Sequence, residues 1–245
     1  HIALNAYAFT ASCYVVDANT PRYRLRWWDV WDWGWTPSGT FDGAAYFDQV
    51  PIPDAAIPAK DTDGHVMFWS PSTDQMWEFW LFHFDRDGQP KAAHGGRIDN
   101  YSTSDARFVA PWGVTASGLS WAPIMVTVAE AQAAVAAIRA GQTHQNRIPH
   151  TLYMALIYAK SGEHAWPANR SDGQSSSQAD PCEGQFLRID PALDITALGL
   201  SPLGLALADA AQRYGAVVAD KAGAVNIGCQ AGLPEKLRTG VDPWD

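Results

Sequence analysis

The sequence predicts a mainly β protein, an antiparallel β-sandwich or jelly roll with two peripheral helices. Short runs typical of strands, separated by turn residues, dominate the chain, and only two isolated stretches are typical of helices. The 245 residues fit a single β-sandwich domain, 1–245, because all-β domains commonly reach this length.

Three consecutive strands are expected from residue 65 onward. They cover residues 65–70, 75–84 and 91–99, and short turns rich in Pro, Asp and Gly join them, so neighbouring strands should be antiparallel. If the first turn has four residues, Ser70 faces Gln75 and Met67 faces Glu78. This register predicts that His65 and Glu78 share one face of the sheet.

Two helices are expected in the C-terminal half. Thr127 and Glu130 form a T-x-x-E capping box before an Ala-rich helix over 128–140. A second helix should start after Ser201, with Pro202 at its first position. A long loop is expected over 161–184, which is rich in Ser, Gly, Pro and Asp. The remaining strands are expected over 151–159, 185–189, 216–220 and 224–229.

The composition excludes some partners and favours another. The net charge of -9 is dispersed, which argues against nucleic acid, and no run approaches the roughly 20 apolar residues of a membrane helix. The chain has 12 Trp, and indoles suit flat, half-polar ligands such as sugar rings, although a Trp-rich core is the alternative. Five of these Trp form one run: Trp27, Trp28, Trp31, Trp33 and Trp35.

Cysteine use and the first residue bear on localisation. Among the three cysteines we expect Cys182 and Cys229 to pair, which leaves Cys13. No zinc-site spacing is present, and we expect no metal and no cofactor. The chain starts at His1 like a processed, secreted protein. An N-terminal His can also chelate copper, as in lytic polysaccharide monooxygenases, but the sequence does not identify the second histidine that such a site needs.

Glu78 is the first candidate catalytic residue. It interrupts a strand that is apolar on both faces, so its carboxylate must be paired, protonated or placed in a ligand cleft. Glycoside hydrolysis needs two carboxyl groups, and Glu183 or Asp63 could supply the second, assisted by His65. The alternatives are a Glu78–Arg97 salt bridge, an ordinary loop position without a catalytic role for Glu183, and a turn-forming role for Asp63.

Other residues are candidates for proton transfer or substrate binding. His150 could transfer a proton or be a hydrogen-bonded core residue. In the expected long loop, Arg170 and Asp172 could form a sugar subsite or an ion pair that stabilises the loop. The expected substrate-binding residues are Trp69, Trp80, Arg97, Trp166, Arg170 and Asp172.

Several motifs resemble those of a group of secreted actinobacterial β-rich proteins. They are TDGH at 62–65, SPSTDQMWEFW at 70–80, WPANRSDG at 166–173 and AQRYG at 211–215, and the likeness covers residues 45–228. More distantly, the chain resembles jelly-roll glycanases related to the family 12 endoglucanases. That resemblance implies that Glu78 is the nucleophile and Glu183 the acid/base.

These observations lead to one expected function and two alternatives. We expect a secreted, endo-acting glycoside hydrolase that binds a polysaccharide or oligosaccharide. A polysaccharide lyase would instead use His65 or His150 to abstract the proton beside a uronate, and Arg170 to neutralise its carboxylate. A non-catalytic carbohydrate-binding protein would have a structural Glu78.

Overall fold

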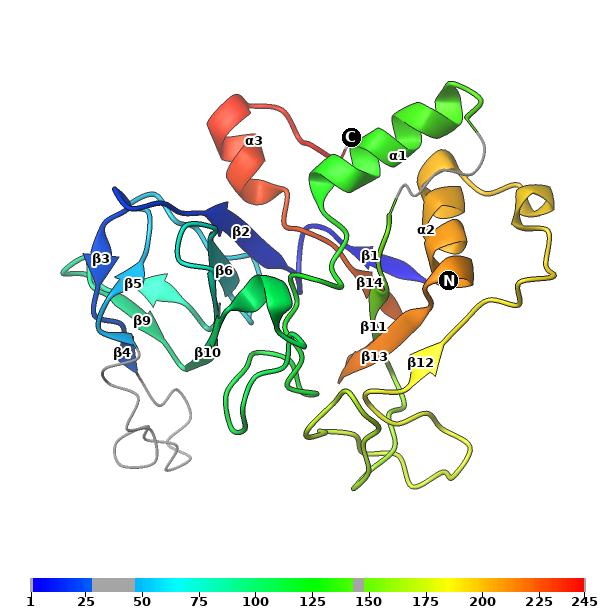
Figure 1. The fold of residues 1–245 in the computed structure, drawn as a ribbon, viewed down its shortest axis with the longest axis horizontal. Coiled ribbons are helices and arrows are strands. Elements are labelled where there is room, and N and C mark those ends of the chain that lie inside the picture. Colours follow the sequence, from blue (N-terminus) through cyan, green and yellow to red (C-terminus); the bar gives the residue numbers. More distant parts are fainter. Residues whose placement is uncertain (1, 28–46, 143–147, 245) are drawn as a thin grey trace.

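The computed structural model describes residues 2–27, 47–142 and 148–244. Within these residues the fold is β-rich, as expected, with two larger sheets, two smaller sheets and three α-helices (Figure 1). The two smaller sheets and the four-stranded sheet lie at one end of the molecule, and the five-stranded sheet with its helices lies at the other.

The four-stranded sheet contains the expected meander. Its order is β10-β7-β6-β2, and the register pairs Ser70 with Gln75 and Met67 with Glu78, which confirms the expected alignment. The antiparallel pairing of β7 with β6 and with β10 is also confirmed. The strands are β2 (Ala11–Val15), β6 (His65–Ser70), β7 (Gln75–Trp80) and β10 (His94–Asp99).

The expected strand 75–84 is in fact two strands. Leu81 has a φ of 53°, which a β-branched or bulky residue rarely adopts, and the chain bends there between β7 and β8. Beyond the bend, β8 joins a small sheet of order β4-β9-β8. Its strands are β4 (Arg26–Trp27), β8 (His83–Phe84) and β9 (Pro90–Ala92); β3 (Arg22–Tyr23) and β5 (Val50–Pro51) form the other small sheet.

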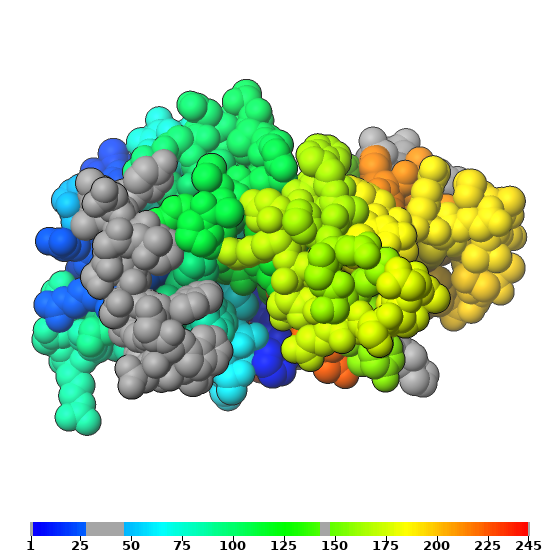
Figure 2. All heavy atoms as spheres, turned by 90° about the horizontal axis from the view of Figure 1, so that it is seen from below, coloured from blue at the N-terminus to red at the C-terminus, as the bar shows by residue number. Residues whose placement is uncertain are grey.

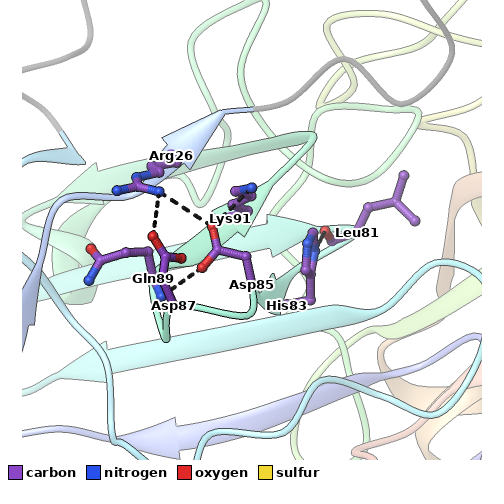
Figure 3. Close-up of polar contacts among 7 residues, drawn as sticks. All are labelled: Arg26, Leu81, His83, Asp85, Asp87, Gln89 and Lys91. Carbon is purple, nitrogen blue, oxygen red and sulfur yellow. Dashed lines mark hydrogen bonds and ion pairs between the residues drawn. The ribbon is translucent and has the colours of Figure 1, made fainter.

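Ion pairs connect the strands of the β4-β9-β8 sheet. Arg26 on β4 lies 3.4 Å from Asp85 and 3.2 Å from Asp87, and Lys91 on β9 lies 2.9 Å from Asp85 (Figure 3). The backbone amide of Gln89 also donates to Asp85 at 2.9 Å. Because these charges compensate one another, the group stabilises the turn.

The five-stranded sheet has the order β1-β14-β11-β13-β12. It collects strands from both ends of the chain, and β1 pairs in parallel with β14. The expected strands of the C-terminal half are all present, though most are shorter than expected. The strands are β1 (Ala3–Asn5), β11 (Leu152–Leu156), β12 (Phe186–Leu187), β13 (Ala216–Lys221) and β14 (Asn226–Gly228).

Both expected helices are confirmed. The Thr127 side chain accepts from the backbone of Glu130, and the Glu130 side chain accepts from the backbone of Thr127, so the capping box before α1 (Val128–Arg139) is complete. Ser201 caps α2 (Pro202–Arg213). A third helix, α3 (Leu233–Thr239), was not expected.

The expectation of a purely antiparallel arrangement is wrong. Four of the described pairings are parallel, namely β1 with β14, β11 with β13, β2 with β6 and β4 with β9. These parallel pairs join segments far apart in the sequence, so local turn signals could not predict them. The sheets confirm neither the expected β-sandwich nor the expected jelly roll.

Three apolar clusters connect the layers. One packs the outer face of the four-stranded sheet against the small sheets, and another packs α1 and α2 on the five-stranded sheet. The third cluster lies between the two larger sheets, where Met67 and Met76 from one sheet join Tyr153 and Val217 from the other. Residues of the two larger sheets therefore share one apolar cluster.

The structure also bears on the cysteines and the Trp run. All three cysteines are free, so the expected Cys182–Cys229 disulfide is wrong.

Trp27, the first residue of the Trp run, packs into the core beside Phe47 and Trp112, with ring centroids 4.8 Å and 5.9 Å away. The other four Trp of the run and His1 lie outside the described residues. None of the described helices is long and apolar enough to span a bilayer.

Candidate functional site

A cavity of about 500 Å³ opens between the two larger sheets. Asp63 and His65 reach it from the start of β6, and Tyr153, Asp220 and Asn226 reach it from the five-stranded sheet. Its volume falls within the usual range of about 300–1,000 Å³ for small-molecule sites. The lining also includes Asn5, Phe9, Trp121, Ala155 and the 221–224 turn.

A tight turn positions Asp63 and His65. The Asp61 carboxylate accepts from the backbone amides of Asp63 at 2.7 Å and Gly64 at 2.8 Å, so Asp61 has the turn-forming role that we considered for Asp63. The Asp63 side chain therefore lines the cavity instead of closing the turn. Gly64 has a φ of 51°, which suits glycine, and this conformation leads directly into β6.

His65 presents an uncharged ring to the cavity. Its exposed fraction is only 5%. Burial lowers the pKa of His65, although the carboxylates of Asp63 and Asp61 and a hydrogen bond with the Val114 backbone oppose this shift. A neutral imidazole that faces a cavity can accept or relay a proton.

Trp121 and Tyr153 form the aromatic wall. The Trp121 ring lies 5.2 Å from the His65 ring and 4.6 Å from the Tyr153 ring, measured between centroids. Burial raises the pKa of the Tyr153 hydroxyl well above its usual value, and the neighbouring Asp220 carboxylate adds to the shift. Tyr153 is therefore a neutral hydroxyl at physiological pH.

Asp220 has a fixed orientation at the end of β13. Its carboxylate oxygens accept from the backbone amides of Lys221 at 2.9 Å and Ala116 at 3.3 Å. Burial, followed by the nearby Asp172 carboxylate, raises the pKa of Asp220 to about 7, whereas the two amides act to lower it. A carboxyl group with such a perturbed pKa in a cavity is a functional candidate.

The segment between β11 and β12, which we call the 157–185 loop, brings two more acids to Asp220. Oxygen atoms of Asp172, Glu183 and Asp220 all lie within 4.8 Å of one another. The Gly184 amide donates to the Val218 carbonyl on β13 at 2.7 Å, which holds Glu183 beside the strand that contains Asp220. The expected long loop is confirmed, and its atoms cover the middle of the face in Figure 2.

Arg170 anchors the loop through backbone carbonyls. Its guanidinium donates to the carbonyls of Ala116 at 3.1 Å, Gly113 at 3.1 Å and Thr115 at 2.8 Å, and also to that of Pro111. No ion pair with Asp172 is found among the described residues, so the expected Arg–Asp pair is wrong. Arg170 is structural in this arrangement.

Glu78 does not reach the cavity. It is fully buried, and it accepts from the Ser120 hydroxyl at 2.5 Å and from the Trp121 amide at 3.0 Å. The expected placement in an indole-walled cleft is therefore wrong, and so is the Glu78–Arg97 alternative, because Arg97 pairs with Asp99 at 2.8 Å. Burial raises the pKa of Glu78 to about 7 against the opposing effect of these donors.

The remaining expected residues lie elsewhere. His150 contacts Glu130 at the start of α1, 3.4 Å away, and Trp166 is 72% exposed on the loop. Trp69 lines a different, largely apolar cavity beside Cys13. Neither Trp80 nor Arg97 lines the inter-sheet cavity.

Sequence reasoning missed Asp220, Tyr153 and Asn226. Asp220 ends an expected strand, where a lone acid after an apolar run could have suggested a site. Tyr153 and Asn226 lie inside expected strands and give no such signal. The structure thus brings Asp63, His65 and Asp220 together around one cavity. Glu183 and Asp172 lie next to Asp220 but do not line the cavity.

Comparison with known proteins adds no assignment to this site. No family model, no curated protein and no solved structure matches the chain.

Proposed function

We propose that the protein is a secreted glycoside hydrolase that cleaves a polysaccharide or oligosaccharide in the inter-sheet cavity. The supporting observation is that Asp63 and Asp220 line the same cavity from opposite sheets, next to Trp121 and Tyr153. Hydrolysis of a glycosidic bond uses two carboxyl groups on either side of the bond. The expected pair of Glu78 and Glu183 is replaced by Asp63 and Asp220.

The local contacts suggest a role for each carboxyl group. Asp220 is oriented by two backbone amides and its pKa is raised to about 7, so it suits a general base that takes up a proton from water near neutral pH. Asp63 lies beside the uncharged His65 ring and suits the acid that protonates the leaving oxygen. Tyr153 and Asn226 offer hydrogen bonds to sugar hydroxyls.

The charges of the cavity favour hydrolysis over β-elimination. A lyase must neutralise the carboxylate of a uronate, and Arg170 was the expected group. Its guanidinium instead donates to backbone carbonyls, and the cavity lining has two acids, Asp63 and Asp220, against one lysine, Lys221, a balance that opposes an anionic sugar. The substrate should therefore be a neutral glycan.

The test measures reducing-sugar release on a panel of neutral and uronate-containing glycans. We expect activity on a neutral glycan, and a fall of at least about 100-fold in kcat/KM for Asp63→Asn and for Asp220→Asn. Asp105→Asn is the matched control, because Asp105 is exposed and lies outside the cavity. Full activity of Asp63→Asn or Asp220→Asn would contradict the proposed carboxyl pair.

Product analysis separates the other functions. Unsaturated products that absorb in the ultraviolet would identify a lyase, and binding without any product would identify a carbohydrate-binding protein. The proposed endo mode predicts a mixture of long products early in the reaction, whereas release of a single small sugar would contradict it.

A further inference from the structure

Asp172, Glu183 and Asp220 form a cluster of three acids without a direct ion pair. Glu183 is fully buried, and within the described residues only Asp172, itself a member of the cluster, shares hydrogen bonds with its carboxyl group. No ion pair of the described chain includes any of the three acids. A buried carboxylate without a partner is unfavourable unless it is protonated or binds a cation.

The nearest cation of the protein does not fill this role. Arg170 acts on Glu183 and Asp220 through its charge, but its nitrogen atoms donate to the backbone carbonyls of the 111–116 segment. Arg170 therefore leaves the carboxyl group of Glu183 without an ion pair, although one Glu183 oxygen lies in the cluster. The complete burial of Glu183 without an ion pair is an observation separate from the proximity of the three acids.

We propose that Asp172, Glu183 and Asp220 form a binding site for a divalent cation of the Ca²⁺ class. All three groups offer oxygen atoms, which Ca²⁺ prefers, and the site contains none of the nitrogen or sulfur ligands typical of zinc. Aspartate and glutamate carboxylates in flexible loops are common Ca²⁺ ligands.

The spacing of the oxygen atoms is compatible with one bound cation. All three atoms lie within 4.8 Å of one another. Ligands bind Ca²⁺ at about 2.3–2.6 Å, so two ligands on opposite sides of the ion lie roughly 4.6–5.2 Å apart. The same separation around Mg²⁺ is only about 4.0–4.2 Å, because Mg²⁺ holds its ligands at about 2.0–2.1 Å. We favour Ca²⁺ because its sites accept several carboxylates in flexible geometry, whereas Mg²⁺ demands near-ideal octahedral geometry.

A bound cation would connect the loop to the cavity. Asp172 and Glu183 belong to the 157–185 loop, whereas Asp220 lies on β13 and also lines the cavity. The cation would offset the repulsion among the three carboxylates and keep Asp220 ionised. This effect on Asp220 rests on the proposed hydrolase function, but the cation site itself does not.

Calorimetric titration of chelator-treated full-length protein with CaCl₂ tests the site. We expect one binding site and a melting temperature that rises with Ca²⁺ concentration, because a ligand of the folded state stabilises it. MgCl₂ should bind at least about tenfold more weakly. Glu183→Gln should weaken Ca²⁺ binding by at least about tenfold, whereas Glu163→Gln, the same change at an exposed position in the loop, should not.

A second variant covers the case in which Glu183→Gln fails to fold. Asp172 is exposed, so Asp172→Asn should fold normally and still weaken Ca²⁺ binding. Absence of Ca²⁺ binding, or unchanged affinity in Asp172→Asn, would overturn the proposal. Because these titrations contain no glycan, a failure of the hydrolase proposal would leave their outcome unchanged, and hydrolysis by a protein that binds no Ca²⁺ would count against this site alone.

Discussion

The backbone amide of Trp121 donates to both carboxylate oxygens of Glu78, at 3.0 Å and 3.2 Å. The Trp121 ring in turn lies against His65 and Tyr153, which line the candidate site. Glu78 is thus a positioning residue: it fixes the segment that forms one wall of the cavity without facing the substrate. Glu78, the first catalytic candidate in the sequence, therefore holds the backbone of Trp121 in place.

Glu78→Gln should destabilise the fold, and more so at acidic pH. The folded state raises the pKa of Glu78 to about 7, so it favours the protonated form. The contribution of Glu78 to stability is therefore complete below the unfolded pKa, near 4.3, and is lost as the pH rises to about 7. We expect urea unfolding to show a loss of about 1–3 kcal/mol for Glu78→Gln at pH 5, and a smaller loss at pH 8.

The comparison between variant and wild type is essential here, because the buried His65 and His94 have lowered pKa values and change the stability in the opposite direction. These histidines are present in both proteins, so the difference between the two isolates Glu78. Glu163→Gln is the exposed control and should show no pH-dependent difference. A larger loss at pH 8 than at pH 5 would show that Glu78 is held as a carboxylate.

Gly184→Ala should loosen the 157–185 loop. Gly184 has a φ of 86°, and a Cβ atom there would lie 1.8 Å from the Ala165 carbonyl oxygen. Gly162 in the same loop has a φ of 73° but open space around it, so Gly162→Ala tests the cost of the backbone conformation alone. We expect Gly184→Ala to lose about 1–3 kcal/mol more than Gly162→Ala and to be cleaved faster in the loop by proteases. Equal losses would contradict the close packing of Gly184.

Local patterns predicted most of the elements between residues 65 and 229, but not β1–β5 or α3. The T-x-x-E box located α1, and the turn after Ser70 set the register of Met67 against Glu78. Such signals lie within a few residues of the structure that they specify. The order of the strands does not follow from them, because the parallel pairs join distant segments of the chain.

The same reasoning explains why the site was only partly predicted. Asp63 and His65 could be identified because a turn before a strand presents side chains. Asp220 reaches them only because β13 belongs to a second sheet that packs against the first, and no local pattern reports that packing. The apolar residues around Glu78 indicated that its face of the strand is buried. They could not indicate that the backbone amide of Trp121 donates to its carboxylate.

The three cysteines should react as free thiols with different accessibility. Cys182 is partly exposed, whereas burial raises the pKa of Cys229 to about 12 and raises that of Cys13 still further. Thiolates are the reactive form, so iodoacetamide should modify Cys182 first in the folded protein and all three cysteines after unfolding. Mass spectrometry of the unreduced, unfolded protein checks this, and only one modified cysteine would reveal a disulfide.

Substitution of His65 should lower the activity, whereas substitution of His150 should lower the stability. His65 lines the cavity beside Asp63, so His65→Asn should lower kcat/KM on the active glycan by about 100-fold or more if the hydrolase proposal holds. His150 lies 3.4 Å from Glu130 in the capping region of α1, so His150→Asn should leave kcat/KM within about twofold.

The effect of His150→Asn should instead appear in the stability. Burial opposes charging of His150, but its contact with Glu130 raises the net pKa above the usual value. This contribution is complete below the unfolded pKa, near 6.5, and is lost as the pH rises through the folded value. The melting temperature of His150→Asn should therefore lie further below that of the wild type at pH 6 than at pH 8. If His150→Asn abolished hydrolysis while its melting curve matched the wild type, the catalytic role would belong to His150 and the inter-sheet cavity would not be the active site.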